Sequence, residues 1–164
     1  MFFSDPELLK RAKIHQLERV ITLFPWIAII DEFQHWIYSH NGHTADQRRE
    51  AWMEILAAYS DSVVDYSGLE PFRMNAWQRQ LHLFEVPFYY IEYGIAQLGA
   101  IGMWKQFREN REVALDRYCA ALQLGGTATL PELYQTAGLQ FDFSKNSIRE
   151  LMQFVQAELD RLTA

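Results

Sequence analysis

The sequence is short of cysteine and of positive charge, and each shortage excludes a class of protein. Cys119 is the one cysteine among 164 residues, so the chain forms no intrachain disulfide and suits a reducing compartment. Lysine and arginine number 15 against 21 aspartate and glutamate residues, which gives a net charge of −6. Because contacts to phosphate groups require clustered positive charge, we expect neither nucleic acid nor an anionic membrane as a partner.

Long apolar runs and an amino-terminal leader are also missing. The longest apolar runs, such as Val20–Ile30, contain a proline or stop at charged residues, well short of the roughly 20 residues that span a bilayer. The start, Met1–Ser4, lacks the basic region of a secretory signal, and Asp5 follows it directly. We therefore expect a cytoplasmic protein without a membrane-spanning segment.

Motifs that would supply a complete catalytic centre are absent from the sequence. It contains no H-E-x-x-H zinc motif, no G-x-S-x-G nucleophile motif, no glycine-rich phosphate loop and no catalytic-cysteine signature. Asp31-Glu-Phe-Gln-His35 differs from H-E-x-x-H at one position, but aspartate there removes the grip of two imidazoles on one ion. Glu32 and His35 also match half of a di-iron carboxylate pattern, whose second half a homodimer would have to supply. We interpret the segment as a helix surface.

A second histidine pair, His40 and His43, flanks Asn41-Gly42. The surrounding residues are typical of a turn, and Thr44-Ala-Asp-Gln47 is a capping box for a following helix. No cysteine or carboxylate stands close enough in the sequence to complete a ligand set. We predict a turn here, and no metal ligands anywhere in the chain.

Helical periodicity runs through most of the sequence, and no segment alternates as a strand does. The length suits one domain with a buried core, and we predict a single all-α domain over residues 1–164. The aromatic content of 15% suggests a fragment of a larger core, or a subunit that hides surface against a partner. The expected helices cover about residues 5–40 with a kink or restart at Pro25, 44–59, 70–86, 88–107, 110–124, 131–136 and 144–162.

Apolar stripes on these helices predict the core. Trp52, Trp77 and Phe107 are expected to be buried, and Cys119 to pack as a small hydrophobic side chain. The other expected core residues are Leu17, Val20, Ile21 and Phe24 on the first helix, Ile55, Leu56 and Tyr59 on the second, Leu115, Tyr118 and Leu122 beside Cys119, and Ile148, Leu151, Met152, Val155, Leu159 and Leu162 on the last.

The most informative segment is His82–Gly99, which places a histidine and three tyrosines within twelve residues. Tyr89 and Tyr93 are four residues apart and would share one helix face, whereas Tyr90 would point elsewhere. Phenol and imidazole groups on one wall can donate hydrogen bonds to an oxyanion, as acyl-transfer chemistry requires.

Three glycines, Gly94, Gly99 and Gly102, fall within the same predicted helix. Each lowers the stability of the helix by about 1 kcal/mol relative to alanine. Glycine in a helix permits the close approach of either another helix or a substrate. The sequence leaves both interpretations open.

The run His82–Ala100 closely resembles the carboxy-terminal part of the oligoendopeptidase F family, which belongs with thimet oligopeptidase among the zinc metallopeptidases that cut short peptides. The resemblance spans essentially the whole chain. It implies an almost wholly helical fold with a deep channel between two halves, in proteins several times longer than this one. Further stretches that agree with it are Asp31–Tyr38, Trp77–His82, Leu124–Thr127 and Leu130–Leu133.

The resemblance also implies roles for the residues of this segment. In the family, a histidine ahead of the tyrosine-rich helix and tyrosines on that helix face the zinc, bind substrate backbone and stabilise the oxyanion. By resemblance, His82, Tyr89 and Tyr93 take these catalytic roles, with Tyr90 as the alternative if the register is off by one. We count Tyr90 and Gly94 as candidate substrate-binding residues.

The family's zinc ligands, an H-E-x-x-H motif and a later glutamate, lie before the region that this chain resembles. We therefore expect zinc in the full-length family but none bound by this chain alone, and we predict that the isolated chain does not hydrolyse peptides. An amino-terminal zinc-binding half would complete the site in trans, unless the chain is the remnant of an interrupted gene. The rival hypotheses are a non-catalytic helical module that binds peptides or forms a homo-oligomer, and a metal–carboxylate protein that uses Glu32 and His35 across a dimer.

Overall fold

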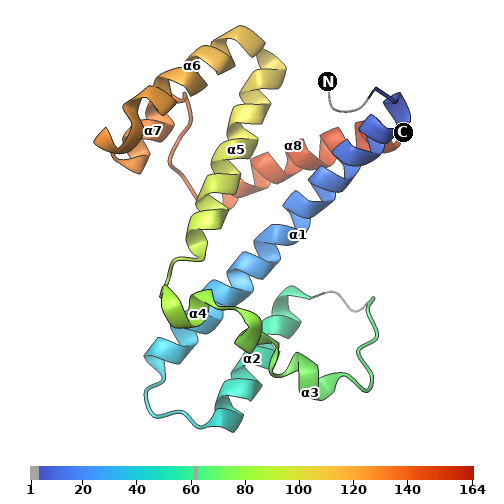
Figure 1. Cartoon of the computed structure of the whole chain (residues 1–164), viewed down its shortest axis with the longest axis vertical. Coiled ribbons are helices and arrows are strands. Elements are labelled where there is room, and N and C mark those ends of the chain that lie inside the picture. The colour runs from blue at the N-terminus through green and yellow to red at the C-terminus, as the bar shows by residue number, and fades with distance from the viewer. Residues whose placement is uncertain (1–3, 61–62) are drawn as a thin grey trace. The chain divides into compact units, whose positions relative to one another are not determined.

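The computed structural model describes residues 4–60 and 63–164, and within them it is built from helices joined by turns and loops, with no strand (Figure 1). The all-α prediction is confirmed. The helices are α1 (Pro6–Ser39), α2 (Ala45–Tyr59), α3 (Glu70–Arg73), α4 (His82–Glu85), α5 (Ile91–Glu109), α6 (Arg111–Leu124), α7 (Leu130–Thr136) and α8 (Lys145–Thr163), with the short 3₁₀ helices η1 (Ala76–Arg79) and η2 (Gly125–Thr127).

The ends of these helices follow local sequence signals. The Thr44 hydroxyl accepts a hydrogen bond from the Gln47 backbone, and the Gln47 side chain accepts one from the Thr44 backbone, which is the predicted capping box. The side chains of Asn110 and Ser144 cap α6 and α8 by accepting a hydrogen bond from the backbone N–H three residues later, without the reciprocal bond of a capping box. Gly125 ends α6 with a φ of +52°, a conformation that glycine adopts without steric cost.

The chain divides into two compact units. Residues up to Ile21 and residues Ile95–Ala164 form unit 1, and Thr22–Gly94 form unit 2. α1 and α5 each contribute residues to both units, and α1 continues as one helix on both sides of Pro25, so it does not restart there. Within the described part of the chain, no helix is both long and apolar enough to cross a bilayer.

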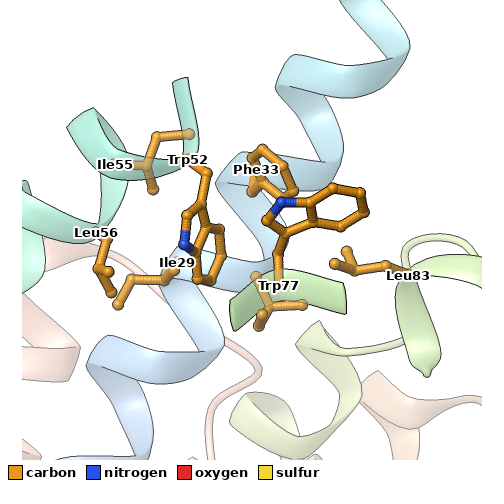
Figure 2. Packing of buried hydrophobic residues seen from close by; sticks show 8 residues of the cluster. Ile29, Phe33, Trp52, Ile55, Leu56, Trp77 and Leu83 are labelled. Carbon is orange, nitrogen blue, oxygen red and sulfur yellow. The ribbon is translucent and has the colours of Figure 1, made fainter. Parts of the chain in front are cut away.

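Unit 2 is organised around three buried aromatic rings, shown in Figure 2. Phe33 from α1 lies edge-on to Trp52 from α2, with ring centroids 5.0 Å apart, and 5.6 Å from the ring of Trp77 in η1. The indole nitrogen of Trp52 donates a hydrogen bond to the backbone oxygen of Arg73 at 2.9 Å, which ties α2 to the end of α3. The predicted burial of Trp52 and Trp77 is confirmed. The remaining members of this aromatic core are Ile29, Ile30, Ile55, Leu56 and Leu83.

Two glycines of α5 are explained by packing within unit 1. A methyl group at Gly99 would lie 2.7 Å from the hydroxyl oxygen of Tyr134, which donates a hydrogen bond to the backbone of Ile95. At Gly102 it would lie 2.8 Å from the side chain of Leu139. Both approaches are too short for a Cβ atom, so glycine at these positions lets the segment around α7 approach α5.

The predicted inward face of α6 is wrong. Leu115, Tyr118, Cys119 and Leu122 are all exposed, and the residue of α6 that is buried is Ala114. The helical period identifies an apolar stripe but not whether a partner covers it within the described residues. Ile21, Tyr59 and Phe107 are also exposed, whereas Leu17, Val20 and Val155 are buried as predicted. Other predicted core residues are only partly buried: Phe24, Ile148, Leu151, Met152, Leu159 and Leu162.

The single helix predicted over residues 70–86 is also wrong, because three short helices occupy this stretch. The side-chain amide of Asn75 donates to the backbone oxygen of Pro71 at 2.7 Å, which competes with continued helical bonding. Gln80 then takes an extended conformation (φ −87°, ψ 91°) before α4 begins at His82. These breaks determine where His82 lies.

Removal of the central ring of the aromatic core tests this description of unit 2. Phe33→Ala is expected to lower the free energy of unfolding by about 3–5 kcal/mol, because the ring is fully buried between two tryptophans. Phe72→Ala removes the same ring from a position that is 75% exposed and should change stability by less than about 0.5 kcal/mol. Urea unfolding followed by tryptophan fluorescence measures both, and equal losses would contradict the assignment of Phe33 to the core.

Candidate functional site

The structure brings the histidine and the three tyrosines of the predicted site together within unit 2. The ring of His82, at the start of α4, has its centroid 6.2 Å from Tyr89, 5.0 Å from Tyr90 and 5.6 Å from Tyr93. Tyr93 also lies edge-on to Tyr89 at 5.8 Å and to Tyr90 at 5.2 Å. We call these four residues the histidine–tyrosine cluster.

The reason for this proximity differs from the predicted one. α5 begins at Ile91, so Tyr89 and Tyr90 precede it, and Tyr89 and Tyr93 do not share a face of one continuous helix. Tyr90, which the helical spacing directs elsewhere, lies against His82 instead. The chain turns here because the Tyr89 backbone N–H bonds to the Val86 oxygen at 3.1 Å.

A buried glutamine supports this turn. Phe88 has a φ of +59°, a left-handed conformation that costs a non-glycine residue roughly 1–3 kcal/mol and needs support from its surroundings. The side-chain oxygen of Gln34 accepts a hydrogen bond from the Phe88 N–H at 2.8 Å, across 54 residues of sequence. Gln34 is 1% exposed, and its Nε2 has no hydrogen-bond partner among the described residues. Gln34 thus holds the backbone directly before the tyrosines.

A second glutamine contacts the imidazole itself. The Nε2 atom of Gln80 lies 2.6 Å from His82 Nδ1, and His82 Nε2 lies 3.1 Å from the hydroxyl oxygen of Tyr93. Neither Gln34 nor Gln80 is among the residues that the sequence predicts for the site. Both do lie in stretches that carry the family resemblance, Asp31–Tyr38 and Trp77–His82, and that was the available signal.

The cluster combines accessible and shielded hydrogen-bond donors. Tyr89 and Tyr93 are 47% and 42% exposed, whereas Tyr90 is partly buried. Burial raises the pKa of the Tyr90 phenol above its ordinary value, and the Trp26 side chain offsets part of that rise. A phenol with a raised pKa stays protonated and remains a donor. Donors arranged in this way can stabilise an oxyanion, but they supply neither a nucleophile nor a metal.

Gly94 lies at the edge of the cluster but faces inward. It is buried, and a methyl group there would make an ordinary contact, at 3.5 Å, with the side chain of Ile27 in α1. Its place in unit 2 is therefore against another helix. The substrate-binding role of Gly94 stays a prediction.

The other histidines and carboxylates singled out in the sequence make local contacts. His35 Nε2 lies 3.6 Å from Asp31, one helical turn away, and Glu32 accepts a hydrogen bond from the Tyr59 hydroxyl at 2.6 Å. The segment from His40 to His43 forms the predicted turn, and Nδ1 of His43 lies 2.6 Å from the His40 oxygen. Among residues 4–60 and 63–164, no three histidine, cysteine, aspartate or glutamate side chains are grouped so as to hold a metal ion.

Comparison with known proteins gives a consistent set of relatives. The family model of peptidase family M3 matches residues 2–153 of the chain. An oligoendopeptidase F homologue from Borreliella burgdorferi is 23% identical over 128 residues, which cover 76% of this chain and 21% of that protein.

Solved structures of similar proteins share the fold. A crystal structure described as an oligoendopeptidase F is 33% identical, with a TM-score of 0.80 over 92% of this chain and 26% of that one. PZ peptidase A with a bound inhibitor is 31% identical, with a TM-score of 0.83 over 90% of this chain and 26% of that one. The chain therefore spans only about a fifth to a quarter of the length of these relatives.

Loss of the Gln34 side chain should loosen the turn before the tyrosines. Gln34→Leu is expected to lower the free energy of unfolding by about 1–3 kcal/mol, since the Phe88 N–H loses its acceptor. Hydrogen exchange should be faster at the Phe88 amide than in the unmodified chain. The matched control is Gln78→Leu, which makes the same change at an exposed position and should leave that amide unaffected. Unchanged exchange in Gln34→Leu would show that other contacts hold the turn.

Proposed function

Because the chain belongs to peptidase family M3, we propose that it supplies the substrate-binding and oxyanion-stabilising wall of an oligoendopeptidase F-like zinc metallopeptidase that hydrolyses short peptides. The observation that carries the proposal is the histidine–tyrosine cluster. It gathers, in one contiguous unit, the side chains to which the family resemblance assigns these roles. The structural similarity to PZ peptidase A and to an oligoendopeptidase F supports the same reading.

The proposed roles follow from exposure and hydrogen bonding. Tyr89 and Tyr93 are exposed phenols that can donate to the oxygen of a peptide carbonyl as it becomes negative, and His82 orients Tyr93 through the contact at 3.1 Å. Tyr90, partly buried beside His82, shapes the substrate side of the wall. Gly94 packs beside Ile27 of α1, and this contact helps to position Tyr93, its neighbour in the sequence.

The described residues do not fit a catalytic zinc ion, since they group no three suitable ligands. Zinc ligands and a general base must therefore come from residues outside this set if the proposed reaction occurs. We propose an amino-terminal zinc-binding part, on the same or another polypeptide, as their source. Such a part would correspond to the three quarters or so of the related structures that the chain does not match.

A non-catalytic module is the second candidate function, and the surface of unit 1 favours it. Exposed Leu115, Tyr118 and Leu122 of α6 line an apolar groove of about 580 Å³ together with residues of α5 and α7. Exposed apolar surface of this kind is typical of protein or peptide contact sites. A module of this type would bind peptides, or a second copy of the chain, without cutting them.

We predict that the purified chain alone does not cleave peptides, because oxyanion donors without a nucleophile retain only a small remnant of an enzyme's rate. Hydrolysis of a quenched fluorescent peptide with added zinc, with and without a chelator, measures this. Cleavage that the chelator abolishes would contradict the prediction and would direct mutagenesis to Glu32, His35, His40 and His43. Binding of an uncut peptide would favour the second candidate.

In an enzyme completed by an amino-terminal part that carries H-E-x-x-H, Tyr89→Phe and His82→Ala are expected to lower kcat by about 10²–10³-fold with little change in KM. Oxyanion donors act mainly on the transition state, which is why turnover should suffer more than binding. The matched control is Tyr66→Phe, the same change at a tyrosine outside the cluster. A normal kcat in the Tyr89→Phe enzyme would show that Tyr89 is not the oxyanion donor and that Tyr90 or Tyr93 has this role.

A further inference from the structure

The contact between Gln80 and His82 has a fixed polarity. It joins two nitrogen atoms, Nε2 of Gln80 and Nδ1 of His82, at 2.6 Å. An amide NH₂ group only donates hydrogen bonds, so Nδ1 must accept and carries no proton. In a neutral imidazole the proton then resides on Nε2.

The position of that proton determines what the Tyr93 hydroxyl can do. With the proton on Nε2, His82 donates to the Tyr93 oxygen at 3.1 Å, and the O–H of Tyr93 remains free for another acceptor. With the proton on Nδ1, Nε2 would instead accept a hydrogen bond from the Tyr93 hydroxyl, which could then not donate to another acceptor. The two tautomers therefore differ in whether Tyr93 can donate to a ligand.

We infer that Gln80 is a positioning residue that holds His82 in the Nε2–H tautomer and thereby leaves the Tyr93 hydroxyl free to donate to a substrate oxygen. The effect of Gln80 on catalysis rests on the proposed function, whereas the assignment of the His82 tautomer is independent of it. In this role Gln80 acts through His82, whose Nδ1 its side-chain amide contacts.

The backbone of Gln80 is held on both sides, which fixes the point from which its side chain extends toward His82. The Gln80 N–H donates to the Trp77 oxygen at 3.0 Å, and its own oxygen accepts from the Leu83 N–H at 3.1 Å. Trp77 and Leu83 are both buried members of the aromatic core. The extended conformation of Gln80 therefore depends on the packing of unit 2. The geometry of the histidine–tyrosine cluster depends in turn on the aromatic core.

The imidazole is confined by its neighbours as well. The Tyr89 ring lies nearly parallel to it, at an interplanar angle of 10°, while Tyr90 and Tyr93 present their rings at 75° and 82°. Rotation of the imidazole would have to displace these rings. Reversal of the tautomer is thus governed by the donor or acceptor character of residue 80.

His43 provides an internal reference with the opposite tautomer. Its Nδ1 lies 2.6 Å from the His40 oxygen and must donate, and its Nε2 accepts from the Nε–H of Arg48 at 2.8 Å. Two histidines of one chain are therefore expected to give opposite nitrogen signatures in the same sample.

The test is the ¹⁵N spectrum of the full chain labelled at the imidazole nitrogens, recorded at about pH 8.5, above the ordinary histidine pKa of about 6.5. His82 is assigned from the signals lost in His82→Gln, and His43 from those lost in His43→Gln. The expected result is a protonated Nε2 and an unprotonated Nδ1 for His82, with the reverse for His43. A protonated Nδ1 on His82 would overturn the inference.

Gln80→Glu turns the donor into an acceptor and should move the His82 proton to Nδ1, reversing its signature. Gln80→Met removes the donor at similar volume and should give a mixture of both tautomers. Gln78→Glu adds the same charge at an exposed position two residues away and should change nothing. An unchanged His82 signature in both Gln80 variants would overturn the inference. Because the spectra need no enzymatic turnover, an absence of hydrolysis by the enzyme completed with an amino-terminal zinc-binding part would count against the proposed function and leave this result intact.

Discussion

The packing of Phe33 between Trp52 and Trp77 is the interaction on which the candidate site depends. It brings together side chains of α1, α2 and η1, three elements that lie apart in the sequence. Gln80 and His82 follow Trp77 by three and five residues, and Leu83, the next residue, is buried in the same core. The position of the imidazole is therefore a consequence of hydrophobic burial before it is a consequence of any polar contact.

Polar contacts then refine what the core places. Gln34 and Gln80 have complementary roles, because one accepts a backbone hydrogen bond that stabilises the turn at Phe88 and the other donates to the ring of His82. Neutral amides suit both tasks, since a carboxylate at the buried position 34 would require a charged partner, and an ionised carboxylate at position 80 has no proton to donate to the imidazole. The arrangement keeps the site's hydrogen-bond donors oriented without introducing a net charge beside them.

The sequence predicts those features that depend on neighbouring residues. The capping box at Thr44, the turn at His40–His43 and the end of α6 at Gly125 are set by local backbone chemistry, and all are present. The position of Tyr90 is not predictable in this way, because it depends on a left-handed Phe88 held from 54 residues away. The exposure of the apolar face of α6 could not be predicted for a different reason. The helical period shows that an apolar stripe exists, but only the tertiary structure shows whether other residues cover it.

Unit 2 is one uninterrupted stretch of chain, Thr22–Gly94, and this has a consequence for synthesis on the ribosome. The aromatic core, both glutamines and the whole histidine–tyrosine cluster are encoded before any residue of α6, α7 or α8. All their mutual contacts can form while the last part of the chain is still being translated. Unit 1 has the opposite property, because the residues up to Ile21 share it with Ile95–Ala164 and meet those partners only after all of unit 2 has been synthesised.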